Sequence, residues 1–374
     1  MIDQPAEDDF DNDDDPVTST PVADGPPSRR LTFRASRDLS NRLDKYLVDR
    51  VGHLSRAEVQ RLIKDKRVTV NGRPGKASYN PREADEIVVD APLPKRELIE
   101  PEPIPLEVLF EDEHILAINK QADLIVHPAR GNWHGTLVNG LVHYAKQWST
   151  IRGPSKPGIL HRLDKNTTGV MLVAKSDEAH WRMGRQFENR TIKKTYLALA
   201  HGIPQLLGDV IDMPIGPDAY VRERMAVRKL EKGGKTATTQ YQVKESFDVS
   251  PEQAGLTFAR GGHANDQHHK APPTGFSLIR LKPRTGRTHQ LRVHLAYKGH
   301  PIVGDTMYGG RVIEYSQDGK TRHFSRQALH AAEITFTHPR TLQPMTIAAP
   351  LKDDIAALLA RLRDSGEQKP AESV

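Results

Sequence analysis

The chain has 374 residues, which is long enough to bury a substantial core and suits more than one domain. It contains no cysteine, which excludes disulfides and thiolate chemistry, and no apolar run approaches the ~18 residues that a membrane-spanning helix needs. Residues 1–28 hold nine Asp or Glu and no Lys or Arg, so that, with a formal net charge of +6 overall, the remainder carries +15. Such a basic body favours a polyanionic partner, most commonly nucleic acid.

The acidic start of the chain lacks the basic and apolar pattern of a secretory signal, so we expect a cytoplasmic protein. Residues 1–30 combine acids, proline and serine with few large apolar residues, which predicts a disordered tail. Residues 366–374 are predicted to form a second, short polar tail.

Residues 31–90 form the first predicted domain, a small basic module. A helix is expected over 41–47, and the capping box Ser55–Glu58 begins a second helix whose apolar stripe is Val59, Leu62 and Ile63. A strand at 67–70, an Asn71-Gly72 hairpin turn and a strand at 86–89 complete it. Basic side chains away from the stripe are candidate phosphate contacts, although a solvated face would look the same: Arg42, Arg56, Arg61, Lys64 and Lys66.

A proline-rich linker is expected over 91–105, followed by a larger domain over 106–365. Strands are expected at 106–110, 115–118, 170–174 and 195–199, and helices near 136–144, 179–189 and 354–363. This mixture predicts an α+β fold with a large central sheet. Residues 248–275 are rich in glycine, proline and histidine and are predicted to be a mobile insertion.

A dense polar cluster covers residues 158–169 and leads directly into the apolar run at 170–173. A polar loop that enters a buried strand can hold functional groups rigidly, although Asp-Lys-Asn and Thr-Gly are equally typical of an ordinary turn. A calcium loop is excluded because Lys175 stands where its last, acidic ligand is required.

A second cluster covers residues 278–292, where a strand is expected to turn into a helix near Thr288 that ends at Gly299. Arg287 would then lie at a helix N-terminus, which favours anions. The alternatives are phosphate binding without a catalytic role and plain surface charge. Gly234-Lys235-Thr236 is no P-loop, because Lys229 occupies the required glycine position, and His263, His268 and His269 lack partner ligands in the insertion.

Several stretches resemble known families. RLDKYLVDR, LSRAEVQRLIKDKRVTVNGRP and EADEIVV resemble the alpha-L RNA-binding motif. HRLDKNTTGVMLVAK, ILAINKQADLIVHP, IKKTYLALAHG and KPRTGRTHQLRVHLAYKGHPIVGDTMYG, which occur in this order, resemble the RluA family of pseudouridine synthases. The resemblance implies a mixed, mainly antiparallel sheet flanked by helices and loops. It also implies conversion of uridine to pseudouridine in RNA, with no cofactor and no metal.

The resemblance implies a role for individual residues. Asp164 would attack the ribose C1′ or remove the 2′ proton, which requires an ionised carboxylate, and Arg287 would be the cation that pairs with it. Tyr196 would stack on the target base, and Arg162 would enter the space left by the flipped-out uridine. Leu291, His161 and Thr168 would complete the substrate site; Thr168 stands where the family usually has serine.

The basic module and GTLVNGLVHY resemble the branch of the family that acts on large-subunit ribosomal RNA. We therefore expect rRNA, free or in an assembling particle, as the partner of a monomeric enzyme that does not bind membranes. The alternatives are the same reaction on tRNA and a non-catalytic ribosome-assembly factor. A glycoside or nucleoside hydrolase would need a second acid, and the first acids after Asp164 are Asp177 and Glu178.

Overall fold

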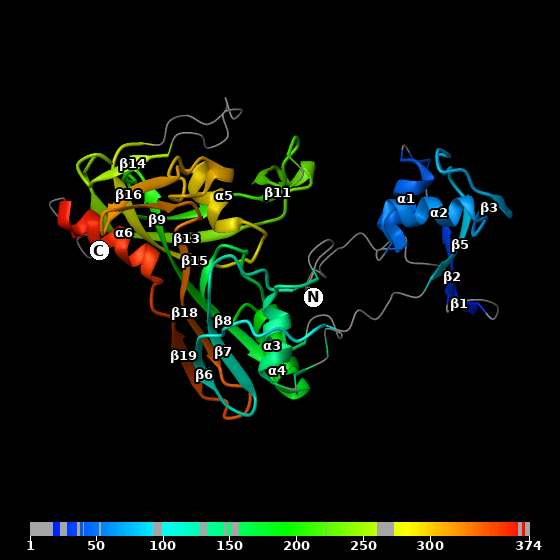
Figure 1. Ribbon diagram of the computed structural model, residues 1–374, viewed down its shortest axis with the longest axis horizontal. Helices are drawn as coiled ribbons and strands as arrows, with labels where there is room; N and C mark the ends of the chain where they lie inside the picture. The colour runs from blue at the N-terminus through cyan, green and yellow to red at the C-terminus, as the bar shows by residue number, and fades with distance from the viewer. Residues whose placement is uncertain are drawn as a thin grey trace, which may run out of the picture. The chain divides into compact units, whose positions relative to one another are not determined.

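The computed structural model describes residues 18–22, 28–35, 38–39, 41–51, 54–92, 99–127, 133–145, 148–149, 151, 157–221, 223–259, 273–365 and 369–370. Residue contacts divide the chain into two compact units, residues 1–97 and 98–374 (Figure 1). No helix in the described ranges is long and apolar enough to cross a membrane.

The N-terminal unit is a five-stranded sheet with two helices packed on it. Its strand order is β1-β2-β5-β3-β4. The elements are β1 (Thr18–Val22), β2 (Ser28–Arg34), α1 (Leu43–Val51), α2 (Arg56–Lys64), β3 (Val68–Val70), β4 (Arg73–Pro74) and β5 (Glu86–Pro92). The predicted capping box begins α2, because Ser55 accepts from the Glu58 N–H while the Glu58 carboxylate accepts from the Ser55 N–H.

The predicted apolar stripe of α2 is confirmed, since Val59, Leu62 and Ile63 are buried in the core of this unit. Positive φ angles of 50° at Asn71 and 73° at Gly72 form the hairpin turn between β3 and β4, as predicted. The first 30 residues are not entirely without structure, because β1 pairs antiparallel with β2. The rest of the acidic segment, 1–17 and 23–27, lies outside the described residues.

The C-terminal unit is α+β, as expected. Its first elements are β6 (Val108–Glu111), β7 (Ile115–Lys120), α3 (Leu137–Tyr144), β8 (Thr168–Ala174), α4 (Asp177–Glu188), β9 (Lys193–His201), β10 (Gly208–Asp212), β11 (Ile215–Pro217) and β12 (Met225–Val227). There follow η1 (Leu230–Lys232), β13 (Thr238–Phe247), β14 (Leu256–Phe258), β15 (Phe276–Pro283), α5 (Gln290–Tyr297) and η2 (Thr306–Tyr308). The last are β16 (Ile313–Gln317), β17 (Lys320–Phe324), β18 (Leu329–Thr337), β19 (Pro344–Ala348), α6 (Asp353–Ser365) and β20 (Lys369–Pro370).

A ten-stranded sheet forms the frame of this unit. Its main order is β10-β13-β15-β9-β18-β8-β7-β6, with β19 paired to β18 and β20 to β13. Every pairing in it is antiparallel except that of β8 with β18. Gly169 and Tyr196 both lie opposite Ala331 of β18, one on β8 and the other on β9. The register therefore brings the loop before β8 level with Tyr196.

Gly169 allows the close approach of β8 and β18. Its φ is +114°, and a Cβ atom built on it would lie 2.2 Å from the carbonyl oxygen of Ala331. Any other residue would meet both the backbone strain and this contact. The polar loop is thus joined to the sheet at a point where only glycine fits.

Three segments differ from the expected linker, insertion and tail. Residues 99–105 belong to the C-terminal unit, because the Glu102 carboxylate accepts from the Gly135 N–H and Glu100 accepts from Asn139. Within 248–275, Leu256 is buried and β14 pairs with β16, while residues 260–272 lie outside the described part. In the predicted C-terminal tail, β20 pairs with β13.

Candidate active site

The loop of residues 161–167 is held by hydrogen bonds from two neighbouring segments. The ammonium of Lys120, at the end of β7, donates to the main-chain oxygen of Lys165 at 2.9 Å. Arg326 donates to the main-chain oxygen of Asn166 at 3.2 Å, and the Gln327 amide donates to Oγ1 of Thr167, also at 3.2 Å. A loop anchored in this way presents its remaining side chains in one orientation.

Lys120 has no solvent exposure, and its ammonium also donates to the main-chain oxygens of Gln121 and Leu124. Burial lowers the pKa of Lys120 to about 7, against the opposing charge of Asp164. Three carbonyl acceptors match the three protons of a charged ammonium. The protonation state of Lys120 is therefore linked to the geometry of the loop.

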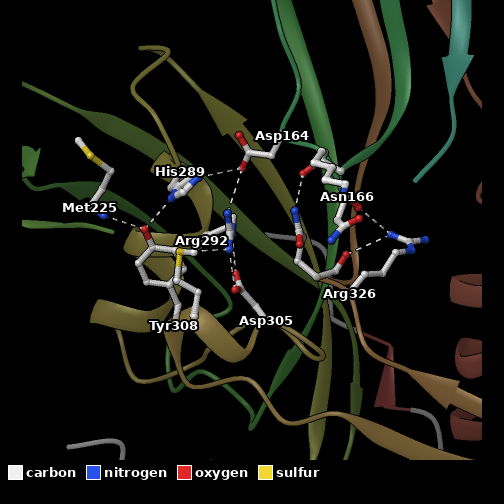
Figure 2. A network of polar contacts seen from close by, with 12 residues as sticks. Asp164, Asn166, Met225, His289, Arg292, Asp305, Tyr308 and Arg326 are labelled. Carbon is white, nitrogen blue, oxygen red and sulfur yellow. Dashed lines mark hydrogen bonds and ion pairs between the residues drawn. The ribbon is translucent and has the colours of Figure 1, made fainter. Parts of the chain in front are cut away.

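Asp164 projects from this loop toward Arg292 of α5 (Figure 2). Nη1 of Arg292 donates to Oδ2 of Asp164 at 3.3 Å, while Nε and Nη2 form a two-pronged pair with Asp305 at 2.7 and 2.8 Å. The side chains of Arg292 and Asp305 are 7% and 2% exposed, whereas that of Asp164 is 22% exposed. The guanidinium is thus fixed from behind by Asp305 and offers one N–H to the more accessible carboxylate.

Charge balance supports this arrangement. Burial alone would lower the pKa of Arg292, but its hydrogen bond to Asp305 and the charges of Asp305 and Asp164 outweigh burial and raise the pKa. The guanidinium is therefore charged at every pH at which the fold is stable. It also lies over the Tyr308 ring, 4.9 Å from the centroid.

Buried polar side chains hold α5 in place. The Gln290 amide donates to Thr238 and to Thr239, and its oxygen accepts from Thr285 and from the Arg287 N–H. One helical turn later, His294 bonds to Thr239 as well. These hydrogen bonds fix this face of α5 against β13. The fixed position of α5 directs the Arg292 side chain toward the loop of residues 161–167.

His289 is the residue immediately before α5 and lies beside Asp164. Its Nε2 is 4.0 Å from Oδ2 of Asp164, and its Nδ1 is 2.8 Å from the Tyr308 hydroxyl. The Met225 N–H donates to that same hydroxyl at 3.0 Å. Arg292 and the imidazole of His289 therefore both lie on the Oδ2 side of the Asp164 carboxylate.

Two protein-family models match the chain. The model described as RNA pseudouridylate synthase matches residues 114–297, and the S4 domain model matches residues 41–87. An uncharacterized RNA pseudouridine synthase, YlyB of Bacillus subtilis, is 38% identical over 327 residues, which cover 87% of this chain and 96% of that protein.

Two relatives are named ribosomal large subunit pseudouridine synthase D. The one from Nitrosomonas europaea is 38% identical over 86% of this chain and 85% of its own length. The one from Escherichia coli K12 is 35% identical over 91% and 96%, respectively. This chain belongs to the RNA pseudouridine synthases. It is therefore an isomerase with an N-terminal S4 RNA-binding domain.

Within this synthase, Tyr196 and Leu291 are the two residues that the resemblance led us to expect at the target base. Both side chains are almost completely buried, in β9 and α5. Burial and the charge of Asp164 raise the pKa of Tyr196. The Tyr196 hydroxyl therefore keeps its proton at neutral pH. This state fits a role as a ring surface for the base better than a role as a proton acceptor. Arg162, two residues before Asp164, is exposed.

Arg287 does not occupy the place expected of it. Its Nε donates to the main-chain oxygen of Thr236 at 3.2 Å, and the arginine on Asp164 is Arg292. The expectation failed because α5 begins at Gln290, so Arg287 precedes the helix.

Thr168 and His161 serve the core rather than a substrate surface. The main-chain oxygen of Ala349 accepts from Nε2 of His330 at 3.2 Å, so Nδ1 of that ring accepts the Thr168 O–H at 2.8 Å. Nε2 of His161 accepts from the Leu172 N–H at 3.1 Å. The side chains at the two ends of the polar loop therefore form hydrogen bonds within the protein. The local sequence does not show whether such side chains bond to the protein or to a substrate.

All five basic residues predicted to contact RNA are exposed on the S4 unit: Arg42, Arg56, Arg61, Lys64 and Lys66. The first two are joined by the fully buried carboxylate of Asp44, which accepts from Arg42 at 3.2 Å and from Arg56 at 3.0 Å. Gln60 donates to Asp44 as well, at 2.7 Å. Sequence reasoning missed this acid, although a helical Asp two residues after Arg42 was visible.

The described residues contain no group of three or more His, Asp or Glu side chains placed to hold a metal ion.

Four residues near Asp164 were not among the expected site residues: Lys120, His289, Asp305 and Tyr308. Asp305 and Tyr308 lie in the GDTMYG stretch that supported the resemblance, so the motif was recognised while the individual roles were not.

Proposed function

We propose that this synthase converts specific uridines of large-subunit ribosomal RNA to pseudouridine, with Asp164 as the catalytic carboxylate. The pairing of Asp164 with Arg292, which is itself held by Asp305, supports this assignment most directly. A carboxylate beside a permanent cation remains ionised when substrate excludes water. The names of the two relatives from Nitrosomonas and Escherichia support the substrate class.

The reaction breaks the bond between C1′ and N1 of uracil and forms a bond between C1′ and C5. C5 gives up its proton and N1 takes one up, so the product is an isomer of the substrate. Ionised Asp164 either attacks C1′ or removes the 2′ proton, and both routes place it against the same side of the ribose. Tyr196 supplies a ring surface for the base, with stacking that contributes roughly 1–3 kcal/mol. The base must leave the RNA stack to reach this depth, and Arg162 occupies the vacated space.

The basic surface of the S4 unit holds the RNA by its phosphates while the catalytic unit acts on one nucleotide. Residues 29–92 contain 15 Lys or Arg and nine Asp or Glu. Phosphate contacts carry affinity without reading sequence, so this surface would position the RNA and leave target choice to shape and to the catalytic unit.

The deciding experiment is chemical mapping of pseudouridine in the rRNA of cells that carry the wild-type chain, no chain, or Asp164→Ala. We expect specific large-subunit sites to vanish in both mutant strains and to return only with the wild type. Sites lost from tRNA alone would overturn the substrate class. Sites that persist with Asp164→Ala would overturn the role of Asp164.

A further inference from the structure

His289 has an unusual backbone conformation for a residue with a side chain. Its φ and ψ are 55° and 17°, in the left-handed region that residues other than glycine rarely adopt, because Cβ then crowds the following carbonyl oxygen. The conformation directs the imidazole between Asp164 and Tyr308 (Figure 2). Strain of this kind persists only where surrounding contacts fix it, and it is frequent at functional sites.

The hydrogen bonds of Tyr308 define which ring nitrogen of His289 carries the proton. The Met225 N–H can only donate, so the Tyr308 oxygen accepts from it. The hydroxyl proton then needs an acceptor, and Nδ1 of His289, at 2.8 Å, is the one that the described residues supply. Nδ1 therefore accepts, and a neutral ring has its proton on Nε2, which points toward Asp164.

The ring is neutral near neutral pH. Burial lowers the pKa of His289, and the charges of Arg292 and Arg162 act in the same direction, while Asp164 and Asp305 oppose them. Tyr308 faces the ring as a hydroxyl, because burial raises the pKa of Tyr308 to about 12. Nε2–H is therefore a neutral donor beside a carboxylate.

The separation of donor and acceptor matches one bridging oxygen atom. Nε2 of His289 and Oδ2 of Asp164 are 4.0 Å apart, which is too long for a direct hydrogen bond. An oxygen about 2.8 Å from each atom would fit between them. It would have to accept from Nε2–H and donate to the carboxylate, as a hydroxyl does, and both side chains are accessible, at 16% and 22%.

We propose that His289 is a specificity-determining residue which, together with Oδ2 of Asp164, binds the ribose 2′-hydroxyl of the target uridine. This rests on the proposed function, because a carboxylate that acts at C1′ or on the 2′ hydrogen lies next to that hydroxyl. Within the part of the chain that the structure describes, the hydrogen bond and ion pairs of the Asp164 carboxylate involve Oδ2, which leaves Oδ1 for the reaction. A 2′-hydroxyl contact distinguishes RNA from DNA at this nucleotide.

The test uses a synthetic stem-loop RNA whose target position carries uridine or 2′-deoxyuridine. His289→Asn tolerates the left-handed backbone but has no N–H at the position of Nε2, whereas His289→Gln can place an amide N–H there. We expect His289→Asn to slow conversion of the ribose substrate about 10- to 100-fold and to change the deoxy rate less than about twofold. His289→Gln should recover most of the ribose rate.

Tyr308→Phe provides a second variant, because it removes the donor that orients the ring. We expect it to slow the ribose substrate selectively, by a smaller factor. Equal slowing of both substrates by either variant would overturn the proposal and assign His289 a structural role. If the wild type converts neither substrate nor any uridine of 23S rRNA, the proposed function fails and the inference fails with it.

Discussion

Arg292 is the residue on which the assignment of the active site depends. It donates twice to Asp305 and once to Asp164, which uses the forked geometry of a guanidinium. A lysine has a single charged nitrogen and cannot keep these contacts in place together. The arginine therefore orients the proposed catalytic carboxylate of Asp164 as well as neutralising it.

Arg292→Lys should lower the rate of pseudouridine formation about 100-fold or more while leaving the fold intact. Arg287→Lys is the matched control, because among the described residues the Arg287 side chain bonds to the main-chain oxygen of Thr236 alone. The rate of this variant should stay within a few fold of the wild type. Time courses of conversion of a 23S rRNA fragment measure both. A larger loss at Arg287 would reverse the two assignments.

Lys120 makes the stability of the fold depend on pH. Its pKa falls from an ordinary value of 10.5 to about 7 on folding, so between these values the unfolded chain binds more protons. The contribution of Lys120 to the free energy of unfolding therefore rises with pH across this window, by up to about 1.4 kcal/mol per pH unit. Below pH 7 the contribution is constant.

Lys120→Met should remove this slope. Urea unfolding between pH 7 and 9.5 would show it as a flatter dependence than that of the wild type. Lys320→Met, at an exposed position of β17, controls for the loss of one positive charge. Parallel pH dependences of wild type and Lys120→Met would contradict the prediction.

The single-residue errors of the sequence analysis have a common cause. Arg287 and Arg292 are both basic residues near a helix start, and Thr168 carries a hydroxyl directly after the loop of residues 161–167. Which of them faces the site depends on β13 and β18, which are distant in sequence. Local pattern thus indicated Asp164 and its loop as candidates, but it did not indicate the partners supplied by other strands.

At the scale of elements, the sequence predicted the helices and strands whose formation depends on residues close to one another in the chain. The start of α2 follows from its capping box, and β8 follows from an uninterrupted apolar run that is buried on both faces. The hairpin β16–β17 was missed because its residues are largely polar, and the hairpin β11–β12 was missed because each of its strands has three residues. Both hairpins are ordered by the pairing of their strands with one another. No local sequence pattern predicted the parallel pairing of β8 with β18.

Gly169→Ala tests that parallel pairing. The added methyl would meet the Ala331 carbonyl in β18 at an impossible distance and a disfavoured φ, so we expect a loss of more than about 3 kcal/mol of stability. Gly184→Ala in α4 is the matched control, because nothing lies within 4 Å of its Cβ position. It should gain about 0.5–1 kcal/mol, as expected for a helix interior.

Urea unfolding measures both glycine variants. A Gly169→Ala protein as stable as the wild type would show that β8 and β18 do not approach this closely. A partly folded variant would instead lose activity together with stability, since Asp164 lies five residues before Gly169.

At the scale of the whole molecule, the chain separates RNA binding from chemistry. The S4 match lies in the unit that ends at residue 97, and the synthase match lies in the unit that follows. Each unit has its own hydrophobic core. Folding of the catalytic unit should therefore not require the S4 unit.

Deleting residues 1–97 should leave residues 98–374 folded with one cooperative unfolding transition, and should weaken binding to a 23S rRNA fragment. The loss should shrink as salt rises, because the deleted unit contributes phosphate contacts whose binding follows counterion release. Binding titrations between ~50 and ~200 mM KCl would show a shallower salt dependence. An unchanged slope would mean that the S4 unit does not contact phosphate.

Asp44 has a consequence for the thermodynamics of RNA binding. A free arginine side chain loses about 2 kcal/mol of rotamer entropy when a ligand immobilises it. The buried carboxylate of Asp44 already restrains Arg42 and Arg56 in the folded protein. Much of their rotamer entropy is therefore lost on folding, before an anion binds. Phosphate binding at this pair should therefore show a smaller entropic penalty than binding at Arg61 or Lys64, whose exposed side chains have no hydrogen-bond or ion-pair partner among the described residues.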